Sequence, residues 1–221
     1  MEALLDQVEV RVLGSLVEKQ ITTPEYYPLT LNALMSACNQ KSNRDPVIEV
    51  DEKTVARGLE SLQGKQLART VSGAEMRVPR YYHLFPEVFQ ITPEEVAVLC
   101  VLMLRGPQTV GEIRGRSNRL YDFADLAEAE HTLQQLRERA AGALVKELPR
   151  LPGRKEPRFA HLLAGEPEVA AEEGEPPVEA ATVAVRAENE RLDRLEDEVR
   201  DLRQEVESLS RELQSFREQF E

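Results

Sequence analysis

The chain carries one unit of sequence twice, and this duplication limits what it can fold into more than any other feature. The clearest match joins Pro79-Arg80-Tyr81-Tyr82-His83-Leu84 to Pro157-Arg158-Phe159-Ala160-His161-Leu162. Further matches join Val10 to Val96, Ser42-Asn43-Arg44 to Ser117-Asn118-Arg119, and Leu59 and Leu62 to Leu133 and Leu136. The offset between matching residues is 86 at Val10, 75 at Ser42, 74 at Leu59 and 78 at Pro79, which indicates one copied unit with loops of different length. Because about 75–85 residues can close a small core of their own, we expect two domains rather than a solenoid.

The first repeat, residues 1–90, reads as three helices followed by a hairpin. Apolar residues at helical spacing predict a helix from Leu5 to about Gln20. Pro28-Leu29-Thr30 opens a second helix with Thr30 as its cap, and a third helix runs from a cap at Asp51 to Gly64. Two strands, Leu67–Val71 and Arg77–Leu84, then flank a turn that contains Gly73. This order is typical of a winged helix-turn-helix domain, in which the hairpin loop is the wing.

The second repeat, residues 91–164, shows the same order. Thr92-Pro93-Glu94-Glu95 is a strong helix start, and this helix should end at Gly106. Thr109 opens the next helix, and the apolar face of a third is formed by Leu126, Ala129, Leu133 and Leu136. Two strands, 143–148 and 158–162, flank a basic wing at 150–155. The predicted fold class is therefore α+β, mainly α: two tandem winged helix-turn-helix domains followed by a C-terminal coiled-coil helix.

At several ordered strings the chain resembles a known family. These strings are Glu18-Lys19-Gln20-Ile21-Thr22-Thr23-Pro24-Glu25-Tyr26-Tyr27-Pro28-Leu29, Ala37-Cys38-Asn39-Gln40-Lys41-Ser42-Asn43-Arg44-Asp45-Pro46-Val47, Leu104-Arg105-Gly106-Pro107-Gln108-Thr109 and Pro152-Gly153-Arg154-Lys155-Glu156. They are similar to the YceH-like family of uncharacterised bacterial proteins over roughly residues 1–165. The resemblance implies two tandem winged-helix domains in a cytosolic bacterial protein. It implies no activity and no functional residues.

The tail differs in composition from the two repeats. Residues 165–184, rich in Glu, Pro, Ala and Gly, read as a solvated linker. Residues 185–221 carry an uninterrupted heptad stripe, whose proposed dimerisation residues are Leu192, Leu195, Val199, Leu202, Val206, Leu209, Leu213 and Phe216. Valine at the first core position with leucine at the second favours a parallel homodimer. The alternatives are a helix that folds back on its own chain or pairs with another protein.

Charge and composition exclude several classes of protein. The net charge is −12, but residues from Ala164 onward hold 18 acidic and 7 basic residues, so the first 163 residues are nearly neutral. An acidic chain of this kind neither excludes nor supports nucleic-acid binding by the repeats. No apolar run is long enough to span a bilayer and no export signal precedes the first helix, so we expect a cytoplasmic protein without a membrane partner. The two cysteines, Cys38 and Cys100, read as small core residues.

No set of residues converges on catalysis. His83 and His161 occupy matching strand positions, which a shared requirement of the fold explains better than chemistry, and His131 lies among acidic residues of a helix. There is no Cys/His spacing for a metal and no glycine loop for a phosphate. We therefore expect no catalytic residue, no cofactor and no metal, and a protein that is not an enzyme.

Double-stranded DNA is the partner that the predicted fold favours, because the third helix of a winged helix enters the major groove. That helix offers Lys53 and Arg57 in the first repeat, whereas its counterpart in the second repeat is mainly acidic. The other basic groups lie on loops and wings. The candidate DNA contacts are Lys41, Arg44, Lys53, Arg57, Arg77, Arg114, Arg116, Arg119, Arg154 and Lys155. The leading hypothesis is a DNA-binding regulator or architecture factor that acts as a coiled-coil dimer. The alternative is an adaptor whose winged-helix faces bind another protein and not DNA.

Overall fold

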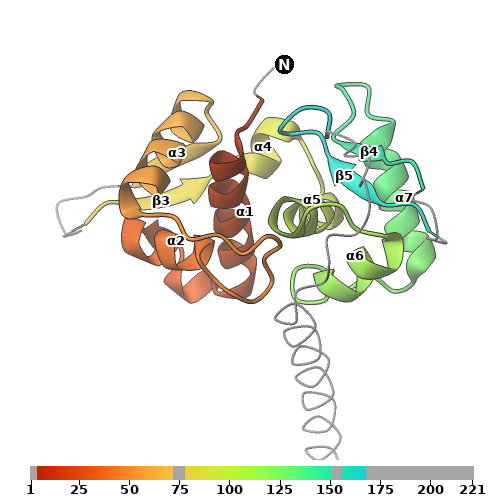
Figure 1. The fold of residues 1–221 in the computed structure, drawn as a ribbon, viewed down its shortest axis with the longest axis horizontal. Coiled ribbons are helices and arrows are strands. Elements are labelled where there is room, and N and C mark those ends of the chain that lie inside the picture. The colour runs from red at the N-terminus through yellow and green to blue at the C-terminus, as the bar shows by residue number, and fades with distance from the viewer. Residues whose placement is uncertain (1–3, 72–77, 151–155, 168–221) are drawn as a thin grey trace, which may run out of the picture. The chain divides into compact units, whose positions relative to one another are not determined.

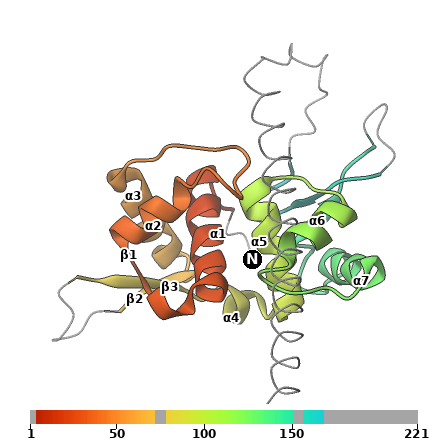
Figure 2. The same cartoon turned by 90° about the horizontal axis from the view of Figure 1, so that it is seen from below.

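The computed structural model describes residues 4–71, 78–150 and 156–167. The chain divides into two compact units, Met1–Val169 and Ala170–Glu221, and all the described residues belong to the first. The predicted coiled coil, most of the predicted linker, and Arg77, Arg154 and Lys155 lie outside the described residues. Figures 1 and 2 together label the helices and strands of the first unit, which is an α+β structure with small antiparallel sheets.

Helix starts follow the local capping chemistry that the sequence predicts. The helices of the first repeat are α1 (Gln7–Thr22), α2 (Leu31–Cys38), α3 (Glu52–Gly64) and the short α4 (Phe85–Phe89), with a 3₁₀ turn η1 at Pro24–Tyr26. Those of the second repeat are α5 (Pro93–Arg105), α6 (Val110–Ser117) and α7 (Leu126–Arg137). The predicted caps at Thr30, Asp51, Thr92 and Thr109 are all confirmed. The side chains of Thr30, Asp51 and Thr109 each accept from a backbone N–H that the first helical turn leaves free, and at Thr92 the Glu95 carboxylate accepts from the Thr92 N–H at 2.9 Å.

The strands form two separate sheets. In the first, β3 (Arg80–His83) lies between β2 (Ala68–Val71) and β1 (Leu29–Thr30), and both neighbours are antiparallel to it. In the second, β4 (Val145–Glu147) pairs with β5 (Phe159–His161), and Lys146 lies opposite Ala160. Both predicted hairpins are present, with strands shorter than predicted.

Three local details differ from the sequence prediction. Thr30 caps α2 as predicted, but Leu29 and Thr30 also pair with β3 as a short strand, which was not predicted. The extended backbone of Thr30 suits both roles. Helix α4 was not predicted. Leu126 was expected on the buried face of α7 but is 50% exposed, because it is the first residue of the helix and lies beyond the packed face that begins at Ala129.

The two first helices of the repeats form the centre of the core. Residues 9–18 of α1 and 95–104 of α5 are all buried, and Figures 1 and 2 both show these helices side by side. The Cys100 thiol donates to the Gly14 carbonyl at 3.6 Å, and a Cβ added at Gly14 would lie 3.0 Å from Leu104. Gly14 and Cys100 occupy matching positions of the two repeats. The two helices therefore contact each other through equivalent surfaces, as two subunits do across a two-fold axis. Repeats 1–90 and 91–164 therefore share one hydrophobic core within the unit Met1–Val169.

Both cysteines are buried, free thiols in this core, as the sequence predicts. Within the described ranges, no helix is both long enough and apolar enough to cross a membrane.

Candidate nucleic-acid interface

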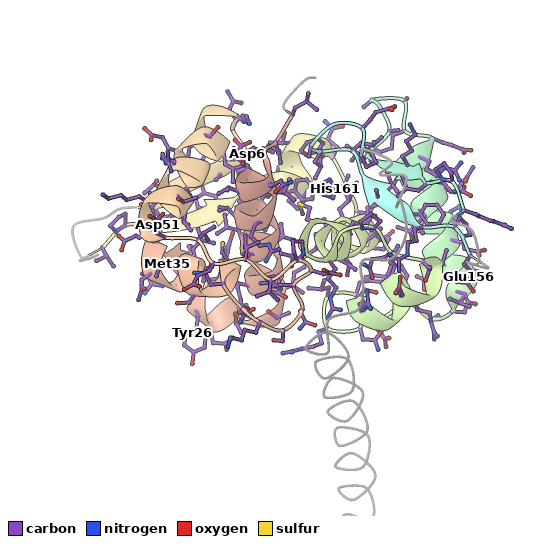
Figure 3. All side chains as sticks on the ribbon, in the orientation of Figure 1. Asp6, Tyr26, Met35, Asp51, Glu156 and His161 are labelled. Carbon is purple, nitrogen blue, oxygen red and sulfur yellow. The ribbon has the colours of Figure 1, made fainter. Side chains whose placement is uncertain are left out.

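The exposed face of α3 carries the basic pair of the first repeat. Lys53 and Arg57 lie four residues apart and both are exposed, on the side opposite the buried Val55 and Leu59. Arg57 makes a weak contact with the Thr54 hydroxyl at 3.4 Å. The Asp51 carboxylate caps the helix by accepting from the Thr54 N–H at 2.8 Å (Figure 3). The helix thus presents two cationic side chains on one accessible face.

The matching face of α7 does not carry this basic pair. At the offset of 74 residues that relates the two third helices, Lys53 corresponds to Ala127 and Arg57 to His131. A new carboxylate, Glu130, takes the place of Ala56, and all three second-repeat residues are exposed. The two third helices therefore differ in charge at these positions: α3 has Lys53 and Arg57, whereas α7 has Glu130 and no Lys or Arg.

Arg44 is a correction to the predicted DNA contacts. Its side chain has no exposed surface, and its guanidinium makes a two-point contact with Glu18 of α1, at 3.0 and 2.6 Å. A further N–H donates to the Ala37 carbonyl at 2.9 Å. Since these partners occupy the guanidinium in the interior, Arg44 joins the loop after α2 to α1 and does not face a ligand. Its match in the repeat, Arg119, is exposed.

The other described candidates divide into free and engaged groups. Lys41 and Arg119 are exposed. Arg114 is half-buried and donates to the carbonyls of Phe123 at 3.4 Å and Ala124 at 3.2 Å, so much of its side chain serves the loop before α7. Arg116 is exposed and lies 3.6 Å from Glu112, one turn earlier on α6. Lys41, Arg116 and Arg119 are therefore exposed, whereas Arg114 is held by the loop before α7.

An ion pair between a buried glutamate and a partly buried base, which sequence reasoning missed, occurs once in each repeat. Glu9 of α1 contacts Lys65 at 2.6 Å, and Glu95 of α5 lies 3.5 Å from Arg139. Burial alone raises the pKa of the Glu9 carboxyl, but hydrogen bonds from Lys65, Ser61 and the Asp6 backbone outweigh burial and hold the pKa below its usual value. The repeat itself could have revealed these ion pairs, because Glu9 and Glu95 match at the offset of 86 residues and Lys65 and Arg139 match at the offset of 74 residues.

The two matched histidines are neutral parts of the fold. Burial lowers the pKa of His83 and of His161 to about 4 in each case. The His83 ring accepts from the Phe85 N–H at 3.2 Å, and its backbone N–H donates to the Tyr27 hydroxyl at 2.8 Å. Among the described residues, no group of three or more His, Cys, Asp or Glu side chains has the arrangement of a metal site.

A groove lies between α6, α7 and β5 of the second repeat. It has a volume of about 390 Å³, and its apolar lining includes Val110, Leu126, Leu133 and Phe159. Glu130 and Glu156 also line it, and Figure 3 shows Glu156 on the side of the second repeat where α6 and α7 lie. Sequence reasoning missed this groove because its walls come from residues up to 49 positions apart, from Val110 to Phe159.

Comparison with known proteins places the chain in a family. A family model described as a protein of unknown function, DUF480, matches residues 5–154. A UPF0502 protein of Geobacter sulfurreducens is 55% identical over 221 residues, which is the whole of both chains. A UPF0502 protein of Geotalea daltonii is 58% identical over 198 residues, which cover 90% of this chain and 89% of the relative. A UPF0502 protein of Solibacter usitatus is 49% identical over 221 residues, the whole of both chains. The resemblance to an uncharacterised bacterial family is thus confirmed, and the chain belongs to the DUF480/UPF0502 family.

Proposed function

We propose that the chain is a non-enzymatic, tandem winged-helix protein that binds double-stranded DNA through its first repeat and dimerises through its tail. It would act as a transcriptional regulator or a DNA-architecture factor. The observation that carries this proposal is the exposed pair Lys53 and Arg57 on α3. The order of helices and hairpin in each repeat supports the winged-helix assignment.

The geometry of α3 suits a duplex. In a winged helix the third helix lies in the major groove, where Lys and Arg contact phosphates or the acceptor atoms of guanine. Lys53 and Arg57 are one turn apart, about 6 Å along the axis at 1.5 Å per residue. They therefore project from the same face and can reach one groove together. The exposed Lys41 adds a further positive group on the loop after α2.

The test is a binding measurement on the full chain with a labelled duplex of about 30 base pairs at low salt. Reversing both charges, Lys53→Glu with Arg57→Glu, should weaken binding at least tenfold. If both residues contact phosphate, the slope of log affinity against log salt should also become shallower by about 2, since each phosphate contact contributes about 0.9.

The repeat supplies the matched control. Ala127→Glu with His131→Glu places the same charges at the corresponding positions of α7 and should leave the affinity unchanged. Absence of salt-sensitive binding by the unmodified chain would contradict the proposal. Equal losses in the two double variants would contradict the assignment to the first repeat.

A further inference from the structure

We propose that the groove between α6, α7 and β5 is a docking site for a segment of another protein, and that this segment carries bulky apolar side chains flanked by Lys or Arg. This inference concerns the second repeat and does not rest on DNA binding by the first. The first repeat would then bind nucleic acid through α3, and the second repeat would bind a protein partner through this groove.

The dimensions of the groove suit a peptide segment. Its lining follows α7 from Leu126 to Arg137, which is about 16 Å of helix at 1.5 Å per residue. A single small side chain would fill only part of that length. Leu133 and Phe159 are buried and form the apolar lining, whereas Leu126 keeps half of its surface exposed. An exposed leucine beside an apolar groove is the arrangement that receives the hydrophobic anchors of a bound segment.

The charged side chains of the lining indicate which residues a bound segment should carry. Glu130 and Glu156 are exposed, and in the described part of the chain neither has an ion-pair partner. Arg137, the basic residue of the lining, is matched by Glu147 at 2.8 Å. Among the described residues, the lining therefore carries two carboxylates that no basic side chain contacts. These favour Lys or Arg on the occupant and disfavour the phosphates of DNA.

The same charges argue against occupation by the tail of the protein itself. Residues 185–221 contain 12 acidic and 7 basic residues, so the tail would bring like charge to the groove. A basic partner segment complements the lining better.

Comparison of the repeats shows what is particular to the second one. The positions that match Leu126 and Glu130 in the first repeat are Glu52 and Ala56. In α3 a carboxylate, Glu52, thus stands where α7 has the exposed Leu126, and Ala56 stands where α7 has Glu130. One repeat presents bases on its third helix, whereas the other presents a leucine and a carboxylate beside a groove.

The experiment is selection of displayed random 12-residue peptides on the immobilised full chain, followed by affinity measurements on synthesised winners. The expected winners combine two or more bulky apolar residues with Lys or Arg. Leu126→Asp should weaken their binding at least tenfold, and so should Glu130→Lys with Glu156→Lys. Both variants change exposed residues, and unchanged helical circular dichroism would show that each remains folded. Leu4→Asp, a change at another exposed leucine, 61% exposed, should leave the affinity unchanged.

Several results would overturn the proposal. These are no enrichment of peptides, winners without basic residues, or winners whose affinity is the same for the chain with Leu126→Asp. Competition by a synthetic peptide of residues 185–221 would assign the groove to the tail. Loss of duplex binding on Leu126→Asp would assign it to nucleic acid. The variant Lys53→Glu with Arg57→Glu should still bind the peptides, which separates this site from the DNA proposal.

Discussion

Removal of Arg44 should destabilise the protein severely without acting on a ligand surface. In Arg44→Met the apolar stem remains, but Glu18 loses both of its guanidinium contacts, at 3.0 and 2.6 Å. The Glu18 side chain is only 11% exposed, and its remaining ion-pair contact among the described residues is with Lys19 at 3.7 Å. The Ala37 carbonyl also loses a donor.

The magnitude follows from burial. Breaking a buried ion pair by removal of one partner costs about 3–5 kcal/mol, because a charge is left without compensation in the interior. Against a total stability of about 5–15 kcal/mol, that loss is a large fraction. The matched control is Arg137→Met. Arg137 contacts Glu147 at 2.8 Å, but both side chains are 38% exposed, so its loss should cost about 0.2–1 kcal/mol.

The assay is urea denaturation followed by circular dichroism of the helices, because the chain has no tryptophan for fluorescence. A double-mutant cycle with Glu18→Gln should give a coupling energy well above that of the exposed pair. If Arg44→Met lost no more stability than Arg137→Met, the burial argument would be refuted. Duplex affinity per folded molecule should be unchanged by Arg44→Met, since this side chain has no exposed surface.

Three further predictions follow from the core and the tail. The unfolded pKa of histidine, about 6.5, exceeds the folded value of about 4 for His83 and His161, so the unfolded chain binds more protons between these values. The stability that neutral histidines confer is present above pH 6.5 and is lost as pH falls toward 4. In the double variant His83→Gln with His161→Gln, the free energy of unfolding from denaturation curves should therefore decrease less between pH 6.5 and pH 4. Gly14→Ala should lower the melting temperature, because the added Cβ would lie 3.0 Å from Leu104 and 3.2 Å from the Met103 Cβ. Gly115→Ala should raise the melting temperature, because no atom lies within 4 Å of the added Cβ and alanine gains about 1 kcal/mol of helix propensity. Equal melting temperatures for these two variants would contradict close packing of α1 on α5. Leu202→Asp with Leu209→Asp should halve the mass measured by light scattering, and deletion of residues 185–221 should give the mass of a shortened monomer. A dimer mass for either variant would exclude the parallel coiled-coil dimer.

Much of the secondary structure could be predicted because its causes are local. Thr30, Asp51, Thr92 and Thr109 cap their helices through N–H groups within the next three residues, so a short stretch of sequence contains the whole interaction. The exposure of Lys53 and Arg57 was equally predictable, since helical period places them opposite the apolar stripe of α3.

The sequence by itself therefore determined the duplication, the helix starts and the two hairpins. Tertiary structure alone decided which matching residues kept the same role. In the tertiary structure Arg44 is a buried partner of Glu18, while Arg119 is exposed. Residues 9–18 of α1 and 95–104 of α5 are buried because each helix packs against the other and against further helices of its own repeat. It also created the groove on the second repeat from α6, α7 and β5. These outcomes depend on the distance between side chains far apart in the chain, which a residue pattern of period 2 or 3.6 does not encode.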